Sequence, residues 1–295
     1  MRSLAGINAA SLEALLRAIH LPFQPQVLAA VLRLRDDTRM DFIELDRLIR
    51  ADQNIASVIL KMANSTFYAR GREIRTLPQA IGMIGFRTIM SIVTAASAKS
   101  IFASGNYTRF KRLVWEHSLV TAVVGKIICE QMGWRHLSEE VFIGGLLHDI
   151  GKVILNQLDR EKFIAVLDRT LESGLPFRYA ENEVFGVDSK SVGQLIIKIW
   201  NLPVVYREVA ALIHRPHDAA LAKLPAKDRE IIRIVGTANH LAKTNGFGYL
   251  ERGEIPELGD YYGALEIIPP CALDSIAWRE AVMRDPYYQV FTAIH

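Results

Sequence analysis

Apolar residues in this chain recur at intervals of three and four, and the strict apolar–polar alternation of a β-strand does not appear. Such spacing is typical of helices that bury one side. In residues 52–64, for example, one face consists of Ile55, Val58, Ile59, Met62 and Ala63. The pattern predicts an all-α fold, with that face buried.

Capping residues, prolines and glycines place the ends of the expected helices. Asp41 and Glu44 have capping-box spacing, and Pro25 suits a first helical turn, where its missing N–H costs nothing. Gly133 and Gly246 each follow an apolar stripe and are expected to end a helix. The expected helices span 76–85, 87–101, 109–132, a segment from 138 that carries His148, 159–174, 188–200, 203 to before 216, 225–245 and a short segment near 278.

Composition and charge narrow the classes of function. Half of the 295 residues are hydrophobic, and the formal net charge of +3 is too small to indicate a nucleic-acid or membrane partner. Cys129 and Cys271 have the spacing of neither a disulfide framework nor a zinc site, which favours a reducing compartment. No apolar signal region follows Met1, and no stretch of about 18 apolar residues occurs. We therefore expect a cytoplasmic protein that binds neither nucleic acid nor membrane.

Three expected helices each place a polar residue against apolar surroundings. His117 and Asn239 share helix faces with apolar residues, and the His148-Asp149 pair follows the apolar run 141–147. Buried polar groups are costly unless something satisfies them. The sequence therefore predicts that the four side chains converge in one buried pocket between three helices.

Two kinds of partner would satisfy these four side chains. Imidazole nitrogens and a carboxylate suit one divalent metal ion, Fe, Mn, Ni or Zn. Neighbouring helical residues point about 100° apart, so His148 and Asp149 reach one ion most easily near a helix end. The alternative is a web of hydrogen bonds in which Asp149 accepts from an imidazole N–H. The residues alone leave both alternatives open.

The string His148-Asp149-Ile150-Gly151-Lys152 resembles the signature of the HD superfamily of metal-dependent phosphohydrolases. The upstream half of the chain resembles the HDOD family, a relative of the HD domains. The strings that carry this second resemblance are Leu21-Pro22-Phe23-Gln24-Pro25-Gln26-Val27, Ala63-Asn64-Ser65-Thr66-Phe67-Tyr68, Leu77-Pro78-Gln79-Ala80-Ile81, Ile84-Gly85 and Trp200-Asn201-Leu202-Pro203. The resemblance covers roughly residues 15–250.

The resemblance implies an all-α architecture and a role in bacterial signal transduction. An N-terminal helical lobe, residues 1–105, would pack on an HD-like helical lobe, residues 106–250. Residues 251–295 would form a C-terminal extension packed on the core.

The resemblance also assigns metal ligands. The HD pattern consists of a His, a His-Asp pair and a later Asp, and the first three fall on His117, His148 and Asp149. The last falls on Asn239, so this chain lacks the final carboxylate. Lys152 follows the pair and would meet a phosphate. The alternatives for Lys152 are a solvated side chain or an ion pair with Asp149.

Superfamily enzymes that cleave cyclic dinucleotides carry further histidines, and at those positions this chain has Ser189 and Ile213-His214. We therefore expect a non-catalytic signal-transduction module that acts by binding a protein partner. The alternative is a metal-dependent phosphohydrolase, a phosphodiesterase acting on a nucleotide or cyclic dinucleotide through an ion held by the two histidines and the aspartate. A nucleotide ligand bound without turnover is a further alternative.

Overall fold

The protein folds as a set of packed helices. The computed structural model describes residues 13, 16, 49, 53–69, 71, 73–103, 108–174, 176–215, 217–247 and 275–293. These residues form helices and no strand, which confirms the predicted all-α fold class. The predictions made at residues 21–27, at Asp41 and Glu44 and at Cys271 lie outside the described residues.

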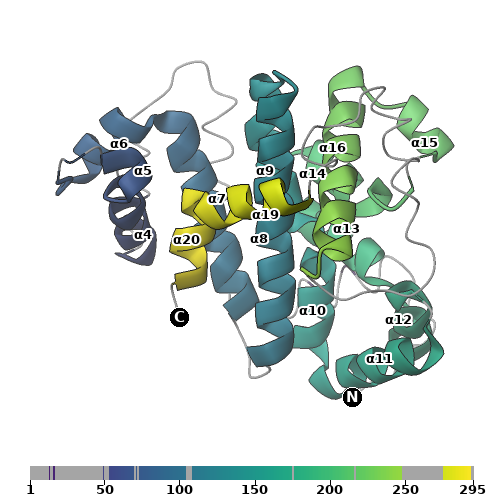
Figure 1. Cartoon of the computed structure of the whole chain (residues 1–295). Coiled ribbons are helices and arrows are strands. Elements are labelled where there is room, and N and C mark those ends of the chain that lie inside the picture. The colour runs from purple at the N-terminus through teal and green to yellow at the C-terminus, as the bar shows by residue number, and fades with distance from the viewer. Residues whose placement is uncertain are drawn as a thin grey trace.

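The described helices, coloured along the chain in Figure 1, are α4 (Gln53–Ala63), α5 (Thr66–Ala69), α6 (Leu77–Ile84), α7 (Phe86–Ala103), α8 (Thr108–Gln131), the 3-10 turn η1 (Arg135–Leu137), α9 (Ser138–Leu147), α10 (Ile150–Leu158), α11 (Arg160–Ser173), α12 (Phe177–Phe185), α13 (Ser189–Ile199), α14 (Val204–Leu212), α15 (Ala219–Ala222), α16 (Ala226–Thr244), α19 (Ser275–Arg284) and α20 (Pro286–Ala293).

Side-chain caps begin several helices where the sequence predicted them. Asp159 accepts a hydrogen bond from the backbone N–H of Lys162 at 3.1 Å and begins α11. Asp188 does the same with Ser191 at 2.8 Å and begins α13. Such caps satisfy N–H groups that have no partner inside the helix. Gly174 ends α11 with φ 67°, a left-handed conformation that favours glycine.

Helix α8 lies at the centre of the molecule, packed against α9 and α16 (Figure 1). Glycines permit this close packing. A Cβ on Gly145 of α9 would lie 2.6 Å from the Cα of Ala122 in α8, and a Cβ on Gly144 would lie 3.3 Å from the side chain of Val235 in α16. Because α8, α9 and α16 also carry or adjoin the candidate polar residues, this packing brings those residues together.

The C-terminal helices pack against α4, α7 and α8. The predicted apolar face of α4 is buried, and α4 contacts α6 and α7. Helix α20 contacts α4, α7 and α8, and α19 contacts α8 (Figure 1). The ring of Tyr287 in α20 lies 4.6 Å from that of Phe142 in α9.

The structure differs from the predicted helices after Ser138 and at the C-terminal end. The helix that begins at Ser138 does not carry His148, because it ends at Leu147 and is followed by a turn. The short helix expected near Trp278 is confirmed as α19, and a further helix that was not predicted, α20, follows it. Asp285 separates them and caps α20 by accepting a hydrogen bond from the backbone N–H of Tyr287 at 2.8 Å.

Helix α12 was missed by the sequence analysis, which expected no helix between residues 174 and 188. It is short and begins directly after Pro176. Its buried positions, Phe177, Ala180, Glu181 and Phe185, follow helical spacing, but one of the four is a carboxylic acid, which weakens the apolar pattern.

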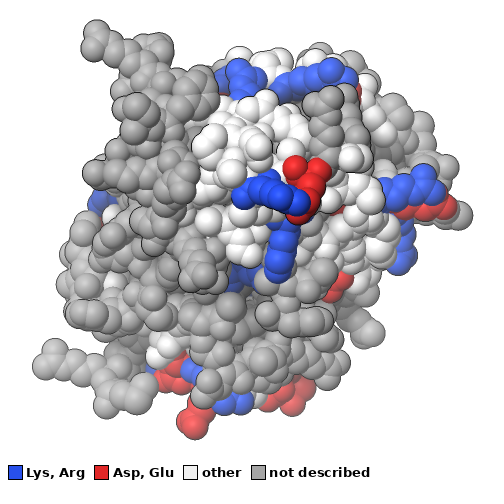
Figure 2. All heavy atoms as spheres, turned by 90° about the vertical axis from the view of Figure 1, so that its left-hand side faces the viewer, with Lys and Arg blue, Asp and Glu red and all other residues white. Residues whose placement is uncertain are grey.

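Among the described helices, none is by itself both long and apolar enough to cross a bilayer. The pair Leu77–Ile84 and Phe86–Lys99 reaches that length and apolarity only jointly, with a bend of 115° between them. Figure 2 shows the face on the left of Figure 1, where the described surface is mostly uncharged and the described basic side chains do not form one broad patch.

Candidate metal centre

The His148-Asp149 pair lies in the turn between α9 and α10. The break in the helix lets the two neighbouring side chains meet, and His148 Nε2 lies 3.4 Å from Asp149 Oδ2. Gly151 allows the turn to approach α13, since a Cβ there would lie 1.8 Å from the carbonyl oxygen of Ser189. The expectation that the pair sits near a helix end is therefore confirmed.

The orientation of His148 is fixed by its own helix. Its Nδ1 lies 2.7 Å from the carbonyl oxygen of Gly145. A carbonyl can only accept, so Nδ1 carries the proton and donates, and Nε2 of the neutral ring is left as an acceptor. That Nε2 is buried, makes no hydrogen bond with the described residues and faces the carboxylate of Asp149, which is also an acceptor.

The orientation of His117 follows the same rule with a different partner. Its Nδ1 donates to the carbonyl oxygen of Phe247 at 2.7 Å, which leaves Nε2 as the acceptor. Nε2 lies 2.9 Å from Asn239 Oδ1 and 3.9 Å from Asp149 Oδ2. Burial, reinforced by the neighbouring His148, lowers the pKa of His117 to about 3, so the ring is neutral.

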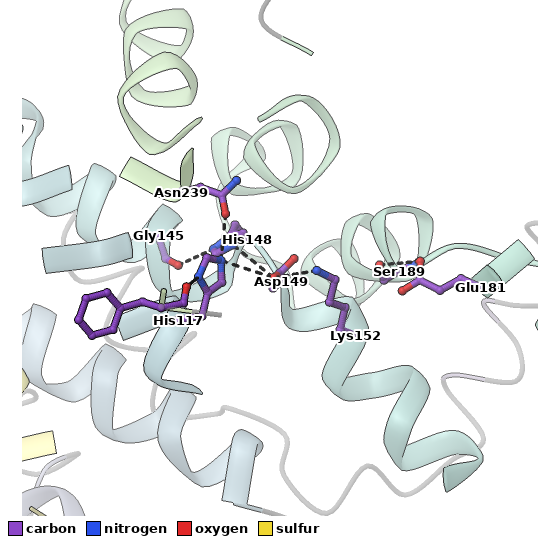
Figure 3. A network of polar contacts seen from close by, with 9 residues as sticks. His117, Gly145, His148, Asp149, Lys152, Glu181, Ser189 and Asn239 are labelled. Carbon is purple, nitrogen blue, oxygen red and sulfur yellow. Dashed lines mark hydrogen bonds and ion pairs between the residues drawn. The ribbon is translucent and has the colours of Figure 1, made fainter. Parts of the chain in front are cut away.

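These contacts bring the four predicted side chains into one buried pocket (Figure 3). The ligand atoms of His117, His148 and Asp149 lie within 4.8 Å of one another. All three are acceptors that point at a common centre, an unfavourable arrangement in a buried site unless a cation joins them. The residues therefore fit one divalent ion held by two imidazole nitrogens and one carboxylate oxygen.

Asn239 stands beside this ligand set as a neutral group. Its amide oxygen would offer a divalent ion a carbonyl ligand without charge. Without an ion, turning the amide so that its NH₂ group faces His117 Nε2 would give an ordinary hydrogen bond. Either orientation satisfies the side chain, so Asn239 fits both alternatives that the sequence left open.

Lys152 supplies the positive charge closest to Asp149. Its Nζ lies 3.1 Å from Asp149 Oδ2 and 4.9 Å from the centre of the Phe177 ring, and the side chain is buried. Burial alone would raise the pKa of Asp149, but Lys152 and His148 hold it well below its usual value. Asp149 is therefore ionised. The predicted alternative of an ion pair between Lys152 and Asp149 is confirmed, and the phosphate contact stays a prediction.

The positions where related enzymes carry further histidines do not form a second cluster of metal-ligand atoms in this chain. The backbone N–H and the hydroxyl of Ser189 both donate to Oε2 of Glu181, at 2.8 and 2.9 Å. Ile213 is a buried apolar side chain. His214 lines the same pocket as His148 but lies outside the cluster of ligand atoms. Burial, reinforced by nearby lysines, holds the pKa of His214 well below its usual value.

Glu181 is a buried acid that the sequence analysis did not single out. Its side chain is fully buried, and Oε1 has no hydrogen-bond partner among the described residues. Burial raises its pKa to about 7, although Lys152 and the hydrogen bonds from Ser189 act in the opposite direction. It was missed because it lies on the unpredicted α12. The helical spacing of Phe177, Ala180 and Phe185 was the available signal.

A pocket opens from the His-Asp centre between α10, α12, α13 and α14. Its cavity volume is about 40 Å³, and its wall includes His148, Asp149 and Glu181. Its cationic side chains are Lys152, Arg178 and Lys190. The pocket thus places three basic side chains next to the acids of the centre.

A family model described as the HDOD domain matches residues 21–216. The chain belongs to the HDOD domain family. The sequence resemblance is therefore confirmed, and the HD-type string lies within the matched residues.

Solved structures support the fold of this HDOD domain. An HDOD domain protein of unknown function from Geobacter sulfurreducens superposes with a TM-score of 0.76 at 21% identity, covering 95% of this chain and 96% of the other. A candidate phosphohydrolase from Shewanella amazonensis SB2B superposes with a TM-score of 0.70 at 18% identity, covering 98% and 100%. These identities establish a shared fold and leave activity open.

One curated relative is much longer than the segment that matches this chain. An uncharacterized protein of Treponema pallidum (strain Nichols) is 22% identical over 219 residues, which are 74% of this chain but 41% of the relative. The match thus spans less than half of that protein.

Proposed function

We propose that this HDOD domain is a regulatory module of signal transduction that binds one divalent ion, acts by contacting a protein partner and does not hydrolyse phosphodiesters. The observation that carries the proposal is the ligand set. It contains three strong ligands, His117, His148 and Asp149, with a neutral amide at the fourth position. The family membership supports the signalling role by analogy.

The missing carboxylate argues against hydrolysis. Asp149 is the only acidic member of the cluster of ligand atoms, so a bound divalent ion would keep a formal charge of +1 from its protein ligands. The Lys152 ammonium 3.1 Å from the same carboxylate adds to this excess of positive charge. This excess weakens retention of the ion, and an ion-bound water has no further carboxylate base beside it in the cluster to take its proton.

A second ion would lack ligands within the described part of the chain. Ser189 is engaged by Glu181 through its hydroxyl and its backbone N–H. Ile213 offers no donor atom, and His214 alone could not hold an ion. A two-ion phosphodiesterase mechanism, in which two metals clamp the attacking and leaving oxygens, therefore has no support here.

The alternative function is hydrolysis of a nucleotide or another phosphoester at a single ion. The specific observation in its favour is the pocket beside the centre, whose lining includes Lys152, Arg178 and Lys190. In that case the ion would polarise a phosphoryl oxygen, and the three cations would bind the substrate's negative charge.

A hydrolysis assay separates the two functions. Purified protein with Mn²⁺ would be assayed with bis(p-nitrophenyl) phosphate, a cyclic mononucleotide and a cyclic dinucleotide. The His148→Ala variant, which lacks one ligand of the centre, would be assayed in parallel as the control. We expect no difference between the two proteins. Turnover by the wild-type protein that His148→Ala abolishes would establish the hydrolase instead.

A further inference from the structure

The two imidazole ligands differ in what holds them. His148 is fixed by the carbonyl of Gly145, three residues earlier in the chain, so its orientation depends on local structure. His117 is fixed by the carbonyl of Phe247, which is 130 residues away in sequence. A hydrogen bond from the outer ring nitrogen of a metal-binding histidine sets its tautomer and its direction. The position of Phe247 therefore decides whether His117 presents Nε2 to the centre.

Phe247 is placed by the end of α16 and by the C-terminal helix α19. Its backbone N–H donates to the carbonyl of Ala242 at 2.9 Å, after Gly246 turns the chain with φ 84°. Its ring lies 6.1 Å from the ring of Trp278, and the guanidinium of Arg279 lies 5.4 Å from its centre. Phe247 and Trp278 are both buried. Helix α19 therefore covers the residue whose carbonyl holds the metal ligand.

The same C-terminal helices also contact α8 immediately before His117. The hydroxyl of Tyr288 in α20 donates to Glu116 at 3.0 Å, and the ring of Phe291 lies 6.1 Å from that of Trp115. Helix α20 contacts α4 and α7 as well. The C-terminal helices thus contact α4 and α7 as well as the two segments that hold His117 in place. These segments are α8, which carries His117, and Phe247, whose carbonyl accepts its hydrogen bond.

We propose that Trp278 and Arg279 are positioning residues for His117, acting through Phe247, and that the packing of α19 sets the affinity of the centre for a divalent ion. The proposal rests on the proposed function only where it assumes a bound ion. The tautomer of His117 can be determined in the protein without an ion, so this part of the proposal does not depend on ion binding. With α19 in place, the ring is held with Nδ1 protonated and Nε2 directed at the centre. Displacement of α19 frees Phe247, and the ring then samples both tautomers.

Two measurements on the full chain test this proposal. Long-range ¹⁵N–¹H NMR of chelator-treated protein reports the imidazole tautomer, with the His117 signal assigned by its loss in His117→Gln. Calorimetric titration with Mn²⁺ reports affinity. Trp278→Leu keeps an apolar side chain at the buried site, and Arg279→Ala removes only the cation over the Phe247 ring. The matched control is Arg284→Ala, an exposed arginine on the same helix that pairs with Glu280.

The variants should separate clearly. In the wild-type protein and Arg284→Ala, we expect one His117 tautomer, with Nδ1 protonated. In Trp278→Leu, we expect both tautomers and Mn²⁺ affinity weaker by roughly 10-fold to 100-fold, the usual range for loss of a partner behind a metal ligand. Arg279→Ala should shift both readouts in the same direction by a smaller factor.

Retention of the single tautomer and of wild-type Mn²⁺ affinity in a folded Trp278→Leu protein would overturn the proposal. If that variant does not fold, Arg279→Ala decides in its place, because an exposed side chain can be removed without emptying the core. If the wild-type protein binds no Mn²⁺, the one-ion centre of the proposed function is wrong. The tautomers of His117 in the wild-type protein and the variants then test the positioning role by themselves.

Discussion

At the scale of single residues, the centre is defined by which imidazole nitrogen carries the proton. His117 and His148 each donate through Nδ1 to a backbone carbonyl, so each directs an unprotonated Nε2 toward Asp149. The sequence predicted that these residues, with Asn239, would share a pocket. It could not predict the tautomers, because the two carbonyls belong to Gly145 and Phe247, whose side chains give no sign of that role.

Asn239 is the position at which substitution by Asp would restore the final carboxylate of the HD pattern. In Asn239→Asp, a carboxylate would stand about 2.9 Å from His117 Nε2, the distance of the present amide oxygen. We expect Mn²⁺ affinity measured by calorimetry to rise by at least about 10-fold, or about 1.4 kcal/mol. Without an ion, the added charge near Asp149 should lower the melting temperature. Asn182→Asp, on the exposed side of α12, is the charge-matched control, and equal Mn²⁺ affinity in the two variants would contradict the assignment.

Glu181 should make stability depend on pH. Its pKa is raised by burial from the usual 4.5 to about 7, so the folded protein holds a proton that the unfolded chain releases. The stabilisation is complete below pH 4.5 and is lost as the pH rises to about 7, by about 3 kcal/mol in total. Lys152 and Asp188 are the charges that act on it, in opposite directions.

Urea unfolding at pH 5 to 8 measures this effect against Glu181→Gln, which cannot ionise. The wild-type free energy of unfolding should fall more steeply with pH than that of the variant, by the stated amount, and should level off above pH 7. Parallel curves for the two proteins would mean that Glu181 does not hold its proton in the folded state.

At the scale of helices, glycines decide how closely the elements of the centre approach. Gly144 and Gly145 are adjacent inside α9, where glycines are costly unless a neighbouring helix approaches closely. Gly145 meets Ala122 of α8, as expected. Gly151 brings the start of α10 against the start of α13, a contact that sequence could not show because its partner atom is the backbone oxygen of Ser189.

Gly151→Ala should therefore be severely destabilising. A Cβ would lie 1.8 Å from the carbonyl oxygen of Ser189, so α10 and α13 would have to separate. We expect a loss of more than about 3 kcal/mol in the free energy of unfolding, or no folded protein, consistent with overpacking of a rigid contact. Gly82→Ala in α6 is the control, because its added Cβ meets nothing within 4 Å and should be neutral or stabilise by up to about 1 kcal/mol. Similar stability changes in both variants would contradict this packing.

The helices that were predicted wrongly have weak local signals in the sequence. Helix α12 is short, and Glu181 interrupts its apolar face. The boundary between α9 and α10 falls at His148 and Asp149, and the apolar residues continue on both sides of this pair, so spacing alone does not reveal the turn. By contrast, α11 and α13 begin at aspartate caps, and their starts were predicted correctly.

At the scale of the whole molecule, the fold places one polar centre inside a helical core and supports it from a distant part of the chain. α8, α9 and α16 bring the ligands together, and the C-terminal helices cover Phe247 and contact α8. The fold class and the ligand candidates were predictable from periodicity and from the HD-type string. The resemblance implied that the C-terminal extension packs on the core, but the residues that α19 and α20 contact were not predictable, because contacts between distant segments leave no local pattern.

The stoichiometry of divalent ion binding tests the central claim most directly. Calorimetric titration of the chelator-treated 295-residue chain with Mn²⁺ counts the ions bound per chain. We expect one ion per chain in the wild-type protein and none in His148→Ala, because the ligands of a single site lie in the cluster of His117, His148 and Asp149. Two ions per chain, no bound ion, or one ion that survives in His148→Ala would contradict a single-ion centre at these residues.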